Sequence, residues 1–337
     1  MTRIVRRGFA LASAMALIVS VFAVTGTVAK ATCQVINDAA PAVSFGTLQS
    51  AVDAASARDT LRVTGTCVGN TTILKLLTIA GAPRATLSGN DAGPVLTIRN
   101  ETTFNFDPVT LVGLTIAHGR ATSTSGGGGI NNSFSGLTLV DSTVTDNAGG
   151  GIVSDHSRVI LQDSAIRNNT VVGIGVNTTE LYVFGASSVD HNSGSGISNG
   201  DSSTRLFDTS SVHHNSTGGD GGGIYNVFGR VVLNDDSSVD HNTAGGDGGG
   251  VFNDFVGSLT LTGRSSISHN RAGGDGGGVN TQRGTTVTLL DASSISNNRA
   301  GGDGGGIWGS NELGSLVNCV AGVNVVHNHP DDIFLEP

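Results

Sequence analysis

Four aspartates recur inside identical glycine-rich segments in the second half of the sequence. The segment Gly-Gly-Asp-Gly-Gly-Gly occurs four times, at spacings of 27, 28 and 28 residues, and contains Asp220, Asp247, Asp275 and Asp303. If the fold repeats at this period, the carboxylates stack on neighbouring units, where like charges repel by roughly 1 kcal/mol per pair in water. Solvation, hydrogen bonds from neighbouring glycine N–H groups or a bound Ca²⁺ would offset this repulsion. The motif lacks the nine-residue period of calcium-binding β-rolls, so solvated turn aspartates and a metal site for Ca²⁺ both stay open.

A second column of polar residues precedes a repeated asparagine. Its members are Asp146, Asn168, His191, His214, His241, His269, Asn297 and His327. The four consecutive histidines predict a ladder of side chains on successive units. Zinc needs converging ligands of fixed geometry, which a straight file of identical side chains supplies poorly, so the alternative is a stack of neutral imidazoles at a corner. The repeated asparagines predict a hydrogen-bonding ladder that satisfies the turn backbone.

A third column lies one position after the aliphatic residues that follow the glycine-rich segments. Its members are Tyr225, Phe252, Asn280 and Trp308. Strand alternation predicts that these side chains face outward. We predict a ligand face at Tyr225, Phe252 and Trp308, whose rings could stack on sugar rings or contact a protein partner. The alternative is that these rings pack over neighbouring loops, such as those that carry Phe228 and Phe255.

A sequence repeat that runs from about Leu137 onward sets the spacing of these columns. Asparagines recur every 22 to 30 residues, at Asn147, Asn169, Asn192, Asn215, Asn242, Asn270, Asn298 and Asn328. Three positions before them stand Val144, Ile166, Val189, Val212, Val239, Ile267, Ile295 and Val325. After the glycine corners come Ile130, Ile152, Ile174, Ile197, Ile224, Val251, Val279 and Ile307. Both aliphatic columns predict core positions. Cys319 takes the place of a core leucine in the last repeat, so we expect it to point inward as a small buried residue.

Units of this length, with short strands and no helical period, predict an all-β fold: a single-stranded, right-handed parallel β-helix. Each repeat forms one coil, and coils stack about 4.8 Å apart. Propeller blades need roughly 40 residues, and leucine-rich repeats need a regular leucine framework, so both fit worse. Earlier alternating segments at 72–75, 77–80, 95–98 and 109–116 predict less regular first coils. We expect about ten coils over residues 71–337.

The segment before the coils predicts a small N-terminal cap over residues 32–70. Cys33 and Cys67 lie at its two ends, and apolar residues repeat at helical spacing from Leu48, behind a Thr47 N-cap. In an oxidising compartment the simplest pairing is a Cys33–Cys67 disulfide, which leaves Cys319 free.

Residues 1–31 have the pattern of a signal peptide. Three arginines precede an apolar stretch from Phe9 to Val24, and Ala29-Lys30-Ala31 supplies the small residues of a cleavage site. Arg6-Arg7-Gly8-Phe9 also resembles a twin-arginine export signal. We predict cleavage after Ala31, no transmembrane segment after signal removal, and a secreted or extracellular protein, with association with the cell surface as the alternative location. The formal net charge of −9 falls further without this basic segment, which argues against nucleic acid or an anionic membrane as partner.

The chain resembles bacterial secreted β-helix proteins with repeats similar to those of polymorphic outer-membrane proteins. The resemblance is carried by the segments Gly221 to Asn226, Gly248 to Asn253 and Ser265 to Asn270. The resemblance covers about residues 45–337. It implies the pectin-lyase-like superfold and an exported or surface location, and it leaves the activity open because that fold hosts lyases, hydrolases and adhesins.

Fragments of catalytic motifs are scattered through the chain. Ala117-His118-Gly119 and Asp235-Asp236 come nearest to the motifs of polygalacturonase-like hydrolases. Lys75 is the only lysine after residue 31 that could serve as the base of a polysaccharide lyase. No acid with a matched base stands out, so we assign no catalytic residue and no cofactor-binding residue.

These observations favour a non-catalytic protein with an adhesin-like or envelope structural and binding role. A glycan or a surface protein is the expected partner, and we expect a monomer. The alternative function is a carbohydrate-active enzyme, a polysaccharide lyase or glycoside hydrolase, on the same fold. A spacer stabilised by calcium, with no binding role, is a third possibility.

Overall fold

The computed structural model describes residues 32–83, 85–99, 107–123, 126–312 and 314–337. The signal-peptide prediction for residues 1–31 lies outside the described residues. The described chain is nearly all β, with one short helix. No helix in these ranges is long and apolar enough to cross a membrane.

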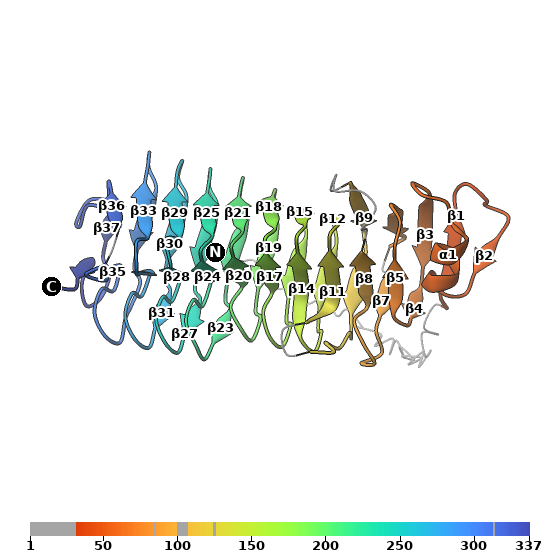
Figure 1. The fold of residues 1–337 in the computed structure, drawn as a ribbon, viewed down its shortest axis with the longest axis horizontal. Helices are drawn as coiled ribbons and strands as arrows, with labels where there is room; N and C mark the ends of the chain where they lie inside the picture. Colours follow the sequence, from red (N-terminus) through yellow and green to blue (C-terminus); the bar gives the residue numbers. More distant parts are fainter. Residues whose placement is uncertain (1–31, 84, 100–106, 124–125, 313) are drawn as a thin grey trace, which may run out of the picture. The chain divides into compact units, whose positions relative to one another are not determined.

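Three long sheets form the walls of a parallel β-helix, and each coil gives one strand to each wall (Figure 1). The first sheet has the order β2 (Ser44–Phe45), β1 (Gln34–Asn37), β3 (Thr60–Thr64), β6 (Thr78–Gly81), β9 (Pro108–Val112), β12 (Gly136–Val140), β15 (Arg158–Gln162), β18 (Glu180–Phe184), β21 (Ser203–Leu206), β25 (Arg230–Leu233), β29 (Ser258–Leu261), β33 (Thr286–Leu289) and β36 (Ser315–Val317). The second sheet contains β4 (Thr66–Val68), β7 (Thr86–Ser88), β10 (Thr115–Ala117), β13 (Thr143–Thr145), β16 (Ala165–Arg167), β19 (Ser188–Asp190), β22 (Ser211–His213), β26 (Ser238–Asp240), β30 (Ser266–Ser268), β34 (Ser294–Ser296) and β37 (Val325–Val326). The third sheet contains β5 (Thr71–Ile73), β8 (Leu96–Arg99), β11 (Gly127–Ser133), β14 (Gly150–Asp155), β17 (Ile174–Asn177), β20 (Ile197–Gly200), β24 (Ile224–Val227), β28 (Val251–Asp254), β32 (Val279–Thr281), β35 (Ile307–Gly309) and β38 (Ile333–Leu335). Each of the last two sheets has 11 strands within the described residues, close to the ten coils expected.

The aliphatic columns line the interior, as predicted. In the second sheet Val239 pairs with Ile267, and Ile267 pairs with Ile295, in parallel register one coil apart. All eight aliphatic residues that stand three positions before the repeated asparagines are fully buried, and so are the eight that follow the glycine corners. Because the register repeats from coil to coil, each inward side chain packs on its counterparts above and below, which gives one continuous core.

The predicted strand at residues 109–116 is wrong as a single element, because the structure divides it into β9 and β10. Gly113 lies between them with φ +62°, a left-handed conformation that turns the chain from the first sheet into the second.

The repeats of 27 and 28 residues are longer than the others because they carry an extra loop between the second and third sheets. We call residues 216–223, 243–250, 271–278 and 299–306 the glycine loops. Three of them pair as a small parallel sheet of β23 (Ser216–Thr217), β27 (Thr243–Ala244) and β31 (Arg271–Ala272). Each loop then continues through a Gly-Gly-Asp-Gly-Gly-Gly segment.

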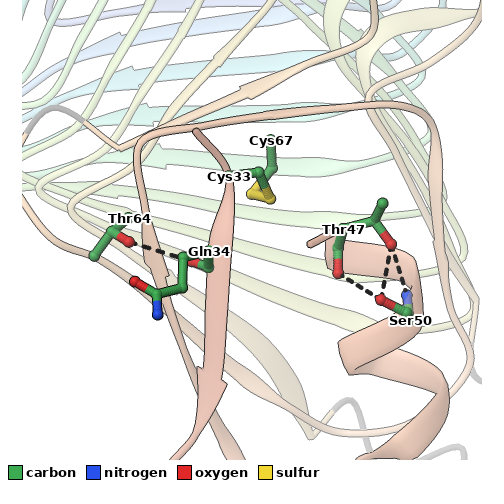
Figure 2. The surroundings of a disulfide bond; sticks show 6 residues. All are labelled: Cys33, Gln34, Thr47, Ser50, Thr64 and Cys67. Carbon is green, nitrogen blue, oxygen red and sulfur yellow. Dashed lines mark hydrogen bonds between the residues drawn. A yellow bond between two sulfur atoms is a disulfide. The ribbon is translucent and has the colours of Figure 1, made fainter. Parts of the chain in front are cut away.

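The N-terminal cap contains the predicted helix and disulfide. Helix α1 (Leu48–Ala54) begins after Thr47, whose side-chain oxygen accepts the Ser50 N–H (Figure 2). Cys33 and Cys67 are joined by a disulfide. β1 pairs antiparallel with β2 and β3, whereas the pairing is parallel from β3 to β6. The first coil begins with β3, inside the segment expected to form the cap.

Candidate functional site

The repeated asparagines form a continuous buried ladder, as predicted. The Asn215 side-chain NH2 donates to Oδ1 of Asn242 at 3.0 Å, and Asn242 bonds Asn270 in the same way. From Asn169 onward each Oδ1 also accepts the backbone N–H of the asparagine one coil earlier, as in the 3.0 Å bond from Asn215 to Asn242, and Asn147 Oδ1 accepts the Gly119 N–H. Each NH2 also donates to a backbone carbonyl, such as that of Val189 for Asn215. This column satisfies buried turn backbone and is not free to bind a ligand.

A second asparagine ladder, which the sequence reasoning missed, lies inside the third sheet. Asn199 donates to Asn226, and Asn226 donates to Asn253, with all three fully buried. The sequence signal was the asparagine that ends the segments Gly-Gly-Gly-Ile-Tyr-Asn and Gly-Gly-Gly-Val-Phe-Asn. These polar groups also stabilise the stack of coils.

The four consecutive histidines form the predicted ladder. The rings of His191, His214, His241 and His269 stack with centroids 4.9–5.1 Å apart and planes within 3° of parallel. All four rings are exposed and lie at corners with φ of 54–55°. Partial burial, followed by the charges of His213, His241 and His191, lowers the pKa of His214, while Asp240 opposes the shift.

The aspartate column is held by backbone hydrogen bonds from its own members. Asp220 Oδ1 accepts the Asp247 N–H at 2.8 Å, Asp247 accepts that of Asp275 at 2.8 Å, and Asp275 accepts that of Asp303 at 2.7 Å. Glycine N–H groups were one of three possible sources of compensation, and the N–H groups that bond these carboxylates belong to aspartates instead. The donor is the next aspartate, because Gly246 lacks a Cβ that would collide with the Asp220 carboxylate.

The charge of the column is only partly compensated. Burial raises the pKa of Asp247, the backbone hydrogen bond from Asp275 lowers it, and the charges of Asp220 and Asp275 raise it again. No group of three or more His, Cys, Asp or Glu side chains able to hold a metal ion occurs in the described ranges. Calcium binding at the column stays a prediction.

The side chains of the aromatic column are less exposed to solvent than strand alternation predicts. Tyr225 and Phe252 stack with centroids 5.3 Å apart, but Phe252 is only 6% exposed and Asn280 is fully buried. The expectation that these two side chains face open solvent is therefore wrong. A Cβ on Gly248 would lie 2.7 Å from the Phe252 Cα, which shows that the glycine loop lies directly against this column. Tyr225 and Trp308 are half-buried, and burial raises the pKa of Tyr225.

The catalytic fragments are not brought together. His118 follows β10 in the third coil and Asp236 follows β25 in the eighth, which separates them by roughly 24 Å along the stack. Arg264 binds Asp236 through two hydrogen bonds of 2.6 Å, and the hydrogen bond lowers the pKa of Asp236. Lys75 donates to the Val52 and Ala55 carbonyls at the end of α1.

The free cysteine behaves much as predicted. Cys319 is half-buried and packs against the core, and burial raises the pKa of its thiol to about 11. A thiol with this pKa is almost entirely protonated at neutral pH, so Cys319 is not a reactive nucleophile.

An open groove with an aromatic edge lies at the corner between the third and first sheets. We call it the Phe228 groove; its volume is about 430 Å³, and its lining includes Glu180, Asp201, Ser203, Phe228, Arg230 and Val256. Phe228 is 56% exposed and Val256 is 69% exposed. The Phe228 ring stacks on Phe255 at 5.0 Å, and the Arg283 guanidinium lies 4.3 Å from the centre of the Phe255 ring.

The chemistry of the Phe228 groove suits a ligand with both apolar faces and hydroxyl groups. An exposed ring offers a flat apolar surface, and carboxylate, hydroxyl and guanidinium groups lie beside it. In the sequence, Phe228 and Phe255 were predicted only as loop residues over which other rings could pack. The available signal was that each phenylalanine stands two residues after a ladder asparagine, at a corner with positive φ.

Residues 292–310 match the Chlamydia polymorphic membrane protein (Chlamydia_PMP) repeat. No curated protein and no solved structure matches the chain significantly.

The matched segment covers two of the three walls of a single coil. It contains β34, the ladder residue Asn298, the last glycine loop with Asp303, and β35. The chain is thus similar to that repeat at the position where a second-sheet strand passes through a glycine loop into the third sheet.

Proposed function

We propose that this protein is an exported, surface-associated β-helix without catalytic activity, which binds a saccharide through the Phe228 groove. The single observation that carries the proposal is the exposed Phe228 ring, supported from behind by Phe255, at the edge of an open polar groove. Apolar ring faces flanked by hydrogen-bonding groups are well suited to sugar rings, which have both apolar faces and hydroxyls.

The regularity of the coils supports a scaffold role. The asparagine and aspartate columns use their polar atoms to bond one coil to the next, and the catalytic fragments lie far apart. We place the ligand face at Phe228 rather than at Tyr225, Phe252 and Trp308, because Phe252 is almost fully covered.

Two further observations support export and a surface location. The Cys33–Cys67 disulfide is typical of proteins outside the cytoplasm. The matched repeat belongs by its name to a polymorphic membrane protein.

Calorimetric binding to a panel of neutral and acidic polysaccharides tests the proposal. For a polysaccharide that binds, replacement of Phe228 by alanine should weaken the affinity about tenfold, a loss of roughly 1.4 kcal/mol. Phe134→Ala is the matched control, because Phe134 also stacks on a neighbouring ring at a corner with positive φ, outside the Phe228 groove.

The same panel separates binding from turnover. Binding without new reducing ends or unsaturated products supports the proposal. Cleavage of any polysaccharide would replace it with the carbohydrate-active alternative, with Glu180 and Asp201 as the carboxylates to replace first. Absence of binding across the panel, or equal binding by the Phe228→Ala variant, would contradict the assignment of the groove.

A further inference from the structure

A second pocket, outside the Phe228 groove, contains three basic side chains on successive coils. It lies at the start of the last glycine loop, has a volume of about 190 Å³, and is lined by Arg271, Arg299 and His329 together with small residues. All three basic residues are exposed. They occupy the position directly after the ladder asparagines Asn270, Asn298 and Asn328.

The backbone fixes these side chains in register. Arg271 pairs with Arg299, and Arg299 pairs with His329, in parallel bridges. The Ala272 N–H donates to the Arg299 carbonyl at 2.9 Å, and the Ala300 N–H donates to the His329 carbonyl at 2.9 Å. The two guanidinium groups therefore project from neighbouring coils, whose spacing is about 4.8 Å.

Among the described residues, no carboxylate forms an ion pair with either arginine of this pocket. Within the described chain, neither Arg271 nor Arg299 lies within 4.0 Å of a carboxylate, whereas Arg264 and Arg62 are each paired with an aspartate. In the loop that begins with Arg271, the Asp275 Oδ1 accepts the Asp303 N–H. Two adjacent like charges repel unless solvent or an anion compensates them.

The shape of the pocket leaves room for such an anion. Ala272 and Ala300 are buried below the basic side chains, and the adjoining Gly301 and Gly302 carry no side chain above the opening. A side chain at position 302 would collide with the Asp275 carboxylate, so the aspartate column itself keeps this edge of the pocket free.

We propose that Arg271, Arg299 and His329 form a binding site for an oxyanion group, such as a sulfate, a phosphate or a carboxylate. A guanidinium group offers a planar fork of N–H donors that matches two oxygens of such an anion. Two forks one coil apart, with an imidazole on the next coil, present donors along one line. The site is independent of the Phe228 groove, which has a different lining.

The test measures binding of dextran sulfate and of free sulfate by calorimetry at low and at high NaCl, with uncharged dextran as reference. The double variant Arg271→Gln/Arg299→Gln should lose affinity about tenfold or more, and the affinity of the unmodified protein should fall as NaCl increases. If free sulfate binds with the same affinity per anion as dextran sulfate, the pocket is a site for a small anion. Binding of the polymer alone identifies a site for an anionic group on a larger ligand.

A matched variant separates this site from a general effect of net charge. Arg120→Gln/Arg167→Gln removes the same charge from exposed arginines whose neighbours in register, Ala148 and Asp190, are not basic. It should leave sulfate binding within about twofold of the unmodified protein. Equal losses in both double variants, or no loss in Arg271→Gln/Arg299→Gln, would overturn the proposal. Thermal unfolding of each variant verifies that the fold is intact.

Discussion

The Asp247 carboxylate lies between two like charges and accepts a backbone hydrogen bond that requires only an oxygen atom. Its Oδ1 accepts the Asp275 N–H, and the Asp220 carboxylate lies one coil away. Burial and the neighbouring carboxylates raise its pKa, so the negative charge destabilises the folded state once this group ionises. The Asp247 Oδ1 atom stabilises the glycine loop as a hydrogen-bond acceptor, whereas the negative charge of the carboxylate does not stabilise it.

Replacement of Asp247 by asparagine should therefore stabilise the protein at neutral pH. Asparagine keeps the Oδ1 acceptor and removes the charge, so we expect a gain on the order of 1 kcal/mol in the free energy of unfolding. When the pKa of a group is higher in the folded than in the unfolded protein, its protonated form stabilises the folded state. This stabilisation is complete below the unfolded pKa and is lost as the pH rises through the folded pKa. The gain should accordingly vanish in strong acid. Urea unfolding at several pH values measures it.

Asp331→Asn is the control, because Asp331 is exposed and lies outside the aspartate column. The calcium interpretation predicts the opposite outcome. If Ca²⁺ raised the unfolding midpoint and Asp247→Asn lowered it, the column would be a metal site.

At the scale of an element, the corner after each second-sheet strand requires a residue that tolerates the left-handed conformation. His191, His214, His241 and His269 adopt it, and Asn168 and Asn297 adopt it in other coils. Asparagine accepts this conformation readily. Stacking follows because the register repeats, and it places ionisable rings about 5 Å apart.

This stack makes stability depend on pH. The pKa of His214 is lowered in the folded state, so the unfolded chain binds more protons between the folded and unfolded pKa values. Stability should therefore fall as pH is lowered from about 6.5 through the folded pKa of His214. Denaturant midpoints from about pH 7 to about pH 5 measure this fall.

His214→Asn should reduce the slope of stability against pH, because it keeps the corner conformation and removes a ring that acquires charge. His118→Asn is the control, since His118 lies at a corner of the same conformation and has no stacked ring among the described contacts. A slope unchanged in His214→Asn would show that the stack does not control the pH dependence.

At the scale of the whole molecule, stability comes from interfaces between coils. A single coil has too few residues to bury its apolar side chains, so each depends on its neighbours, as in other repeat proteins. The asparagine ladder runs through this stack with side-chain bonds of 2.9–3.0 Å from Asn147 to Asn328. A defect in the middle of the ladder should weaken both halves.

Asn215→Ala should lower the free energy of unfolding by about 2–4 kcal/mol. It removes four bonds to buried groups and leaves the Asn192 N–H without its acceptor, and an unpaired buried polar group costs about 1–3 kcal/mol. Chemical denaturation followed by circular dichroism measures the change. Asn311→Ala is the exposed control, and a loss of less than about 0.5 kcal/mol at Asn215 would contradict a structural role for the ladder.

The repeating architecture and its inner columns can be predicted from the spacing of residues along the chain. The aliphatic residues before each asparagine, the imidazole stack and the asparagine ladder could all be predicted, because a parallel β-helix places residues of equal repeat position in register. The Thr47 helix cap follows from local sequence, and the Cys33–Cys67 pairing follows from the number of cysteines in an oxidising compartment. These features depend on spacing along the chain, which the sequence states directly.

The surroundings of each outward column become evident in the folded protein. Strand alternation places Phe252 outside the coil, but its ring stacks on Tyr225 of the preceding coil and is only 6% exposed. Phe228, at the corner after β24, is 56% exposed. In the same way, the position of Arg271 is evident in the sequence, and its pocket exists only because the next coil brings Arg299 beside it. The physical reason is that periodicity fixes the direction of a side chain from its own strand, while its exposure and neighbours depend on loops and coils that lie 20 to 30 residues away in the sequence.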